Sequence, residues 1–178
     1  GLGRDTLFDN TTGSYNVAVG QSALENNTTA NNNTAVGHQA GYSNTTGNEN
    51  VFIGRVAGYA TTNSYNTAVG DAALYSNTSG GTNTAIGKSA LQSNTTASNN
   101  TAVGYQAGYS NTTGTGNAFF GRVSGYSNTA DYNNAFGAAS LYNNTSGTQN
   151  VSMGDASLYI NTTGSYNTSI GGNALRNN

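Results

Sequence analysis

A glycine returns along this chain at an almost constant interval, and this repeat restricts the possible folds severely. The interval is 17 residues, apart from 16 between Gly54 and Gly70 and between Gly121 and Gly137. One short period is typical of a solenoid, in which repeats stack because a single repeat cannot bury its own apolar face. We therefore expect an all-β parallel β-solenoid (β-roll) of about eleven coils of 16–17 residues. The repeat glycines are Gly3, Gly20, Gly37, Gly54, Gly70, Gly87, Gly104, Gly121, Gly137, Gly154 and Gly171.

The composition is unusually neutral and polar. Of the 178 residues, 7% are charged and 34% are hydrophobic, against about a quarter and about half in ordinary globular domains. Asn, Thr, Ser and Gly replace them at fixed phases of the repeat, so we expect their side chains to be part of the fold. A net charge of -2 with no basic stripe argues against nucleic-acid binding. No run of 18 apolar residues is present, so we expect no membrane insertion.

Two asparagine columns accompany the glycines, one four residues before each glycine and one seven residues after it, the second broken at Thr61. Asparagine bonds its own backbone at turns, and stacked amides can form hydrogen-bond ladders. We expect two corners at these columns and a third bend at the repeat glycine, where a Cβ would not fit. Representative structural residues are Asn33, Asn66, Asn100, Asn44, Asn111, Gly37, Gly70 and Gly104.

Two short strands are expected between the corners of each coil, one in the Asn-Thr-Ala-Val-Gly segment 33–37 and one around Ala23-Leu24. In each, a small residue precedes a larger apolar one, and adjacent strand residues face opposite sides. This pattern predicts an alanine-lined interior and an outer apolar stripe. An apolar stripe of this length is unfavourable in contact with water, so we expect another copy of the chain to cover it. The interface of this parallel homo-oligomer would lie at Val36 and its equivalents or at Leu24 and its equivalents.

A longer period of four coils relates residues 21–87 to residues 88–154, and Arg55-Val56 returns as Arg122-Val123. We interpret residues 1–178 as a single repeat domain. Both ends lie inside a repeat without the polar caps that solenoids require, so we expect a segment of a longer fibre.

The pentapeptide Asn-Thr-Ala-Val-Gly, with variants at 83–87 and 167–171, resembles the head repeat of YadA-like trimeric autotransporter adhesins. Similar repeats occur in bacteriophage tail fibres. The resemblance covers the whole chain and implies a left-handed β-roll, three chains side by side, and an extracellular role in surface attachment. The coil is slightly long for that family, and no neck, stalk or anchor accompanies it, which leaves a cell surface and a virion fibre both open.

Catalytic chemistry finds little support in the sequence. With one histidine, no cysteine and scattered acids, no nucleophile triad or metal cluster can be assembled. We expect no enzyme activity, no cofactor and no metal.

One column of charged residues directly follows the repeat glycines. We interpret it as a solvent-exposed edge of the rod. One alternative is a recognition stripe for anionic glycans or protein, and another is a set of inter-chain salt bridges, which contribute little when exposed. The candidate recognition stripe comprises Arg4, His38, Arg55, Asp71, Lys88, Arg122 and Asp155.

A tyrosine column lies five residues after the repeat glycine. Stacked aromatics on a ladder are most often structural, although a sugar could lie against such a stripe. Its members are Tyr42, Tyr59, Tyr75, Tyr109, Tyr126, Tyr142 and Tyr159. The Asn-Thr-Thr triplets also match the acceptor sequence for N-glycosylation. We interpret their repetition as part of the corner ladder, with glycosylation as the alternative. They begin at Asn27, Asn44, Asn94, Asn111 and Asn161.

Three functions are compatible with such a rod. The first is a structural and attachment segment of a trimeric adhesin or tail fibre, with surface glycan or protein as its further partner. The second is an ice-binding β-solenoid, for which the adjacent threonines Thr28 and Thr29 are poorly arranged because neighbours point to opposite sides. The third is a self-assembling extracellular filament whose coils stack end to end.

Overall fold

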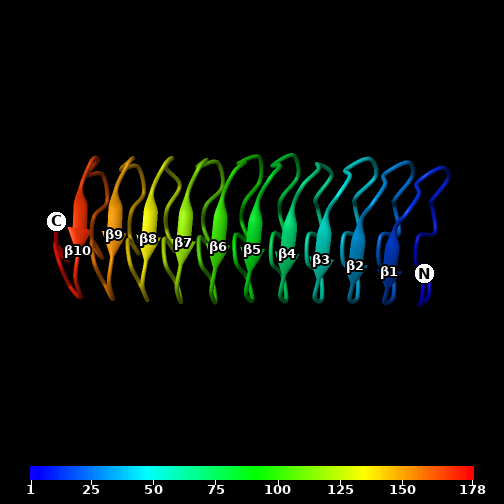
Figure 1. The fold of residues 1–178 in the computed structure, drawn as a ribbon, viewed down its shortest axis with the longest axis horizontal. Helices are drawn as coiled ribbons and strands as arrows, with labels where there is room; N and C mark the ends of the chain where they lie inside the picture. The colour runs from blue at the N-terminus through cyan, green and yellow to red at the C-terminus, as the bar shows by residue number, and fades with distance from the viewer.

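The computed structural model describes all 178 residues and shows a single rod of stacked coils (Figure 1). Its only regular elements are ten strands of three residues, which form one parallel sheet in chain order. The chain makes about nine turns between the first strand and the last, and its ends lie at opposite ends of the rod (Figure 1). The strands are β1 (Val17–Val19), β2 (Thr34–Val36), β3 (Val51–Ile53), β4 (Thr67–Val69), β5 (Thr84–Ile86), β6 (Thr101–Val103), β7 (Ala118–Phe120), β8 (Asn134–Phe136), β9 (Val151–Met153) and β10 (Thr168–Ile170).

The parallel β-solenoid expected from the repeat is confirmed, and each strand pairs in register with its counterpart one repeat on. Ala18 of β1 pairs with Ala35 of β2, for example. The number of strand-bearing coils is ten rather than eleven. The repeat that ends at Gly3 has only two residues before its glycine and forms a single bridge from Leu2 to Val19.

The second strand expected around Ala23-Leu24 is wrong. Ser22 and Leu24 there have φ values of 57° and 49°, which place them in the left-handed region and break the strand. Ala23 and Leu24 are both fully buried, so adjacent side chains point into the core rather than to opposite sides. Leu24, Leu74, Leu91, Leu141 and Leu158 therefore belong to the core, and the alternative that this column forms a subunit interface is wrong.

Hydrogen bonds between coils extend well beyond the strands. Only 18 of the 108 backbone hydrogen bonds lie within strands, so the turns hold most of the stack together. Leu24 N–H donates to the carbonyl of Ala40 at 3.0 Å, and Asn26 N–H to that of Tyr42 at 3.2 Å. A residue in a left-handed turn thus still satisfies its backbone by bonding to the next coil.

The repeat glycine occupies the third bend, as expected. Gly37 has a φ of 140°, and a Cβ on it would overlap the carbonyl oxygen of Gly54 directly beneath it. The same contact recurs from coil to coil, so backbone stacking at this corner leaves no room for a side chain.

Both asparagine columns form buried ladders. In the first, Asn50 N–H donates to Asn33 Oδ1 at 2.9 Å, while Asn33 Nδ2 donates to the carbonyl of Gly47 at 2.9 Å. In the second, Asn94 Nδ2 donates to Asn77 Oδ1 at 2.7 Å. These side chains are fully buried, and burial of an amide is favourable only where hydrogen bonds compensate for its lost hydration. In the second ladder Asn27 Oδ1 and Asn111 Oδ1 are buried without a hydrogen-bond partner.

The core is a narrow column of alanine and leucine with two phenylalanines at equivalent places of the four-coil period. Phe52 lies between Gly41 and Gly58, and a Cβ on either glycine would collide with its ring. In coils farther from the phenylalanines a small residue occupies the strand position and leucines occupy both flanking turns, as in Leu74, Ala85 and Leu91. Ala35 and Ala68, next to Phe52, have one flanking leucine and one flanking glycine. The alternation of Leu and Gly along the sequence therefore compensates for the size of the strand residue.

Candidate functional site

The rod has no internal cavity and no group of three or more His, Asp or Glu side chains that could hold a metal ion. No helix of sufficient length and apolar character to cross a bilayer is present. Candidate sites are therefore columns of exposed side chains, each repeated from coil to coil along the outside of the rod.

The charged column directly follows the bend at the repeat glycine, and the stacking of coils aligns its residues. All seven are exposed, apart from Asp71, which is half-buried. Arg55 Nη2 lies 2.9 Å from Asp71 Oδ1, and Lys88 Nζ lies 3.9 Å from Asp71 Oδ2, so three successive coils form one charge network. Such exposed pairs contribute little to stability.

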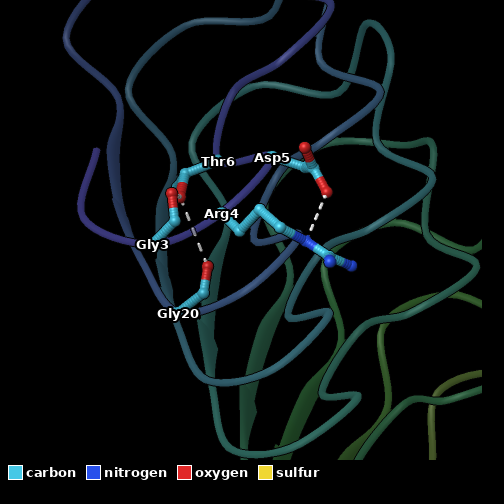
Figure 2. Close-up of polar contacts among 5 residues, drawn as sticks. All are labelled: Gly3, Arg4, Asp5, Thr6 and Gly20. Carbon is cyan, nitrogen blue, oxygen red and sulfur yellow. Dashed lines mark hydrogen bonds and ion pairs between the residues drawn. The ribbon is translucent and has the colours of Figure 1, made fainter.

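At the N-terminal end of this column, Arg4 is directed along its own coil. Its Nε lies 3.0 Å from Asp5 Oδ2, while the neighbouring Thr6 hydroxyl donates to the carbonyl of Gly3 at 2.6 Å (Figure 2). Three of the four cations of the column are thus paired within the chain. Arg122 makes no ion pair, and neither do His38 and Asp155, so the column offers only one uncompensated arginine to an anionic ligand.

The tyrosine column forms two continuous stacks, and all its members except Tyr75, which is 36% exposed, are half-buried. Tyr42, Tyr59 and Tyr75 stack with ring centroids 5.1 Å apart, and Gln92 interrupts the series. The second stack joins Tyr109, Tyr126, Tyr142 and Tyr159 at 5.0–5.1 Å, and Arg176 lies 4.9 Å over the last ring. Because neighbouring ring faces contact one another, the inner rings of each stack, such as Tyr59 and Tyr126, present edges and hydroxyls rather than faces.

Stacking also shifts the acidity of the central rings. Burial raises the pKa of Tyr59 above 10.0, and the neighbouring Tyr42 and Tyr75 hydroxyls raise it further. Burial likewise raises the pKa of Tyr126, with Tyr142 and Tyr109 adding to the effect. A phenolate is disfavoured there because it would lose solvation and face other ionising phenols.

The formal sequons are buried in the corner ladder. Asn27 and its equivalents are at most 1% exposed. Their amide nitrogens, to which a glycan would be attached, already donate hydrogen bonds, as in Asn27 Nδ2 to Asn10 Oδ1 at 2.7 Å. The folded chain therefore does not present these five asparagines for modification.

Most hydroxyls of the threonine column that follows this corner donate to the next coil. The hydroxyl of Thr28 donates to the carbonyl of Thr45 at 3.1 Å, and that of Thr95 to the carbonyl of Thr112 at 3.0 Å. A hydroxyl that already donates to the next coil cannot also donate its hydrogen to an ice lattice, although its lone pairs can still accept hydrogen bonds.

The outer face of the sheet carries a column of apolar side chains, which we call the outer strand column. It lies one residue before each repeat glycine and runs from Val19 to Ile170. Val36, Ile53 and Ile86 are 37%, 39% and 39% exposed. Phe120 and Phe136 stack at 5.0 Å and remain 37% exposed. Nothing within the chain covers this column.

A second set of tyrosines was missed by reasoning from sequence. Tyr15, Tyr65, Tyr132 and Tyr166 all lie five residues before a repeat glycine and are between 58% and 86% exposed. They share a column with Asn, Thr, Glu, Gln and Gly, so no run of identical residues draws attention to them. Alignment on the repeat glycine was the one available signal.

Comparison with known proteins gives no relative for this chain: no protein-family model, no curated protein and no solved structure matches it.

Proposed function

We propose that the chain is a structural rod and attachment segment of an extracellular fibre, of the kind found in trimeric adhesins and bacteriophage tail fibres. In this proposal three copies lie side by side with a left-handed winding, on a cell surface or a virion. The resemblance of the repeat pentapeptide to YadA-like heads supports it, together with the shape of the chain.

The observation that carries the proposal is the outer strand column. Val36, Ile53 and Ile86 lie on one straight face of a ten-stranded sheet and are more than a third exposed. Soluble monomers rarely leave contiguous apolar patches of this extent uncovered. Identical coils present identical rows, so further copies of the same rod match this face along its whole length.

The experiment is the mass of the purified chain in solution by light scattering. Three chains per particle are expected. The double variant Ile53→Glu and Ile86→Glu places charges in the interface, and we expect it to lower the mass to that of one chain. Two exposed residues away from the column serve as the control, through Gln21→Glu and Gln149→Glu, which should leave the mass unchanged.

A stable, well-folded single chain for the unaltered protein would contradict the proposal. Fibres whose length grows with concentration under the electron microscope would instead favour the self-assembling filament.

A further inference from the structure

The four tyrosines that lie five residues before a repeat glycine, here called the turn tyrosines, are held in a costly conformation. Tyr15, Tyr65, Tyr132 and Tyr166 have φ values of 60°, 65°, 58° and 60°. Left-handed backbone disfavours a bulky side chain, by about 1–2 kcal/mol relative to the right-handed region. Tyr15 and Tyr166 are also 86% and 77% exposed, so burial of their rings contributes little to stability.

The fold does not require tyrosine at this position. Other coils make the same turn with Asn32, Asn99 or Gly116, whose φ values are 60°, 61° and 71°. Asparagine and glycine accept this conformation far more readily. Nor do the turn tyrosines stack on one another, because the coils between them carry other residues. The left-handed turn is common to every coil, and the ring of Tyr132 lies against Gly116, but Tyr15 and Tyr166 gain little packing in return for the strain. Bulky, exposed rings at a turn that smaller or more flexible residues can make point to a role outside the fold.

The surroundings of the turn tyrosines are polar and carry no positive charge, and two acids lie among them: Glu49 holds the same position one coil before Tyr65, and Asp131 directly precedes Tyr132. Ser64 precedes Tyr65, and its hydroxyl accepts a hydrogen bond from Asn48 N–H at 2.9 Å, which leaves its own proton to donate. Ser165 precedes Tyr166 and accepts in the same way from Thr148 N–H at 3.0 Å. The column contains no lysine or arginine, so it lacks the charge that an anionic polymer requires.

An exposed tyrosine presents an apolar ring face and a polar tip, beside which these serines add hydroxyl donors. A sugar ring is the matching partner, since it has an apolar face of C–H groups and a rim of hydroxyls. We propose that the turn tyrosines bind a neutral polysaccharide, with sugar rings lying against the phenol rings and sugar hydroxyls bonded to the neighbouring hydroxyls and amides.

The spacing along the rod suits a polymer rather than a single sugar. Tyr15, Tyr65, Tyr132 and Tyr166 are separated by three, four and two coils. At about 4.8 Å per coil these separations are about 14, 19 and 10 Å. One extended chain can contact several rings at once, and weak single contacts then add through effective concentration.

The inference extends the proposed attachment role, and its test does not depend on the number of chains per particle. The variant replaces all four turn tyrosines by asparagine, which suits left-handed backbone. The probes are three soluble neutral polysaccharides, namely dextran, a β-1,3-glucan and mannan, used in affinity electrophoresis. We expect the unaltered chain to be retarded by at least one, and the variant to lose at least tenfold in affinity while melting at the same or a higher temperature.

A matched control replaces four other residues of the same column by serine: Asn32, Thr82, Asn99 and Gln149. This control should keep most of the affinity.

Absence of retardation of the unaltered chain by all three polysaccharides would overturn the inference, as would equal retardation of the asparagine variant. A lower melting temperature of that variant would show that the rings stabilise the fold, and a change in its mass that they belong to a subunit contact. Either result would overturn the inference. A single-chain particle that loses polysaccharide binding with the tyrosines would leave the inference standing while refuting the trimer.

Discussion

Replacing Phe52 by alanine is expected to destabilise the coils around β3 strongly. Phe52 is fully buried, and its ring lies between Gly41 and Gly58 of the two flanking turns. Truncation of a buried phenylalanine costs about 3–5 kcal/mol, in part because of the cavity that remains. We expect a value near the upper end, since the two glycines have no side chains that could collapse into the space.

The same geometry predicts how the loss can be reversed. Elsewhere in the rod Ala85 occupies the equivalent strand position, and Leu74 and Leu91 fill the flanking turns with φ values of 51° and 47°. Adding Gly41→Leu and Gly58→Leu to Phe52→Ala should recreate that arrangement. Each buried leucine contributes roughly 1.5–3 kcal/mol, less about 1–2 kcal/mol for the left-handed backbone. The triple variant should thus recover roughly 2 kcal/mol.

Hydrogen exchange of backbone amides is the appropriate assay, because a solenoid opens locally rather than as one unit. The amides of Gly41 and Gly58, which donate to Ala57 and Ala73 at 2.9 Å, report on the altered coils. The coil of Phe119, four coils away, serves as the internal control. Unchanged protection in Phe52→Ala would refute the packing argument, and so would a triple variant no better protected than the single one.

Three further outcomes are expected. Thr61, which accepts only a 3.5 Å hydrogen bond from Asn77, interrupts the second asparagine ladder, so Thr61→Asn should raise stability by about 1 kcal/mol in thermal unfolding; a lower melting temperature would show that the amide does not fit. The pKa of Tyr59 in the folded chain lies above its ordinary value. The stability that its neutral phenol contributes is therefore fully present below about pH 10 and is lost as the pH rises through the folded pKa. Tyr59→Phe should therefore make the alkaline fall in melting temperature shallower, and an unchanged slope would contradict this. Asp71→Asn should change stability by less than about 1 kcal/mol, because its partners are exposed, and a larger loss would show that the charge network is structural.

Much of this architecture follows from periodicity alone. The repeat glycine, the two asparagine columns and the Asn-Thr-Ala-Val-Gly segment each recur at one phase, and identical residues in successive coils can form ladders only if the coils stack in register. The parallel sheet, the glycine bend and the amide ladders were predicted on this basis and are confirmed by Asn33, Asn50 and Gly37.

The direction of side chains in the turns could not be predicted in the same way. Ala23-Leu24 looks like a strand pair, and strand alternation would place Leu24 outside. Two left-handed residues, Ser22 and Leu24, rotate the chain so that both apolar side chains enter the core. Propensity does not reveal this, because serine and leucine rarely adopt such backbone alone. Bonds to the neighbouring coil impose it.

The candidate surfaces divide along the same line. Which residues share a column is a property of the period, and so the charged column and the stacked tyrosines could be identified from the sequence. Whether a column is free or engaged depends on neighbouring coils: Tyr42 and Tyr59 cover one another's faces, Asp71 binds both Arg55 and Lys88, and Tyr15 stands alone. Exposure depends on contacts between residues 16 or 17 positions apart, and these exist only once the coils have stacked.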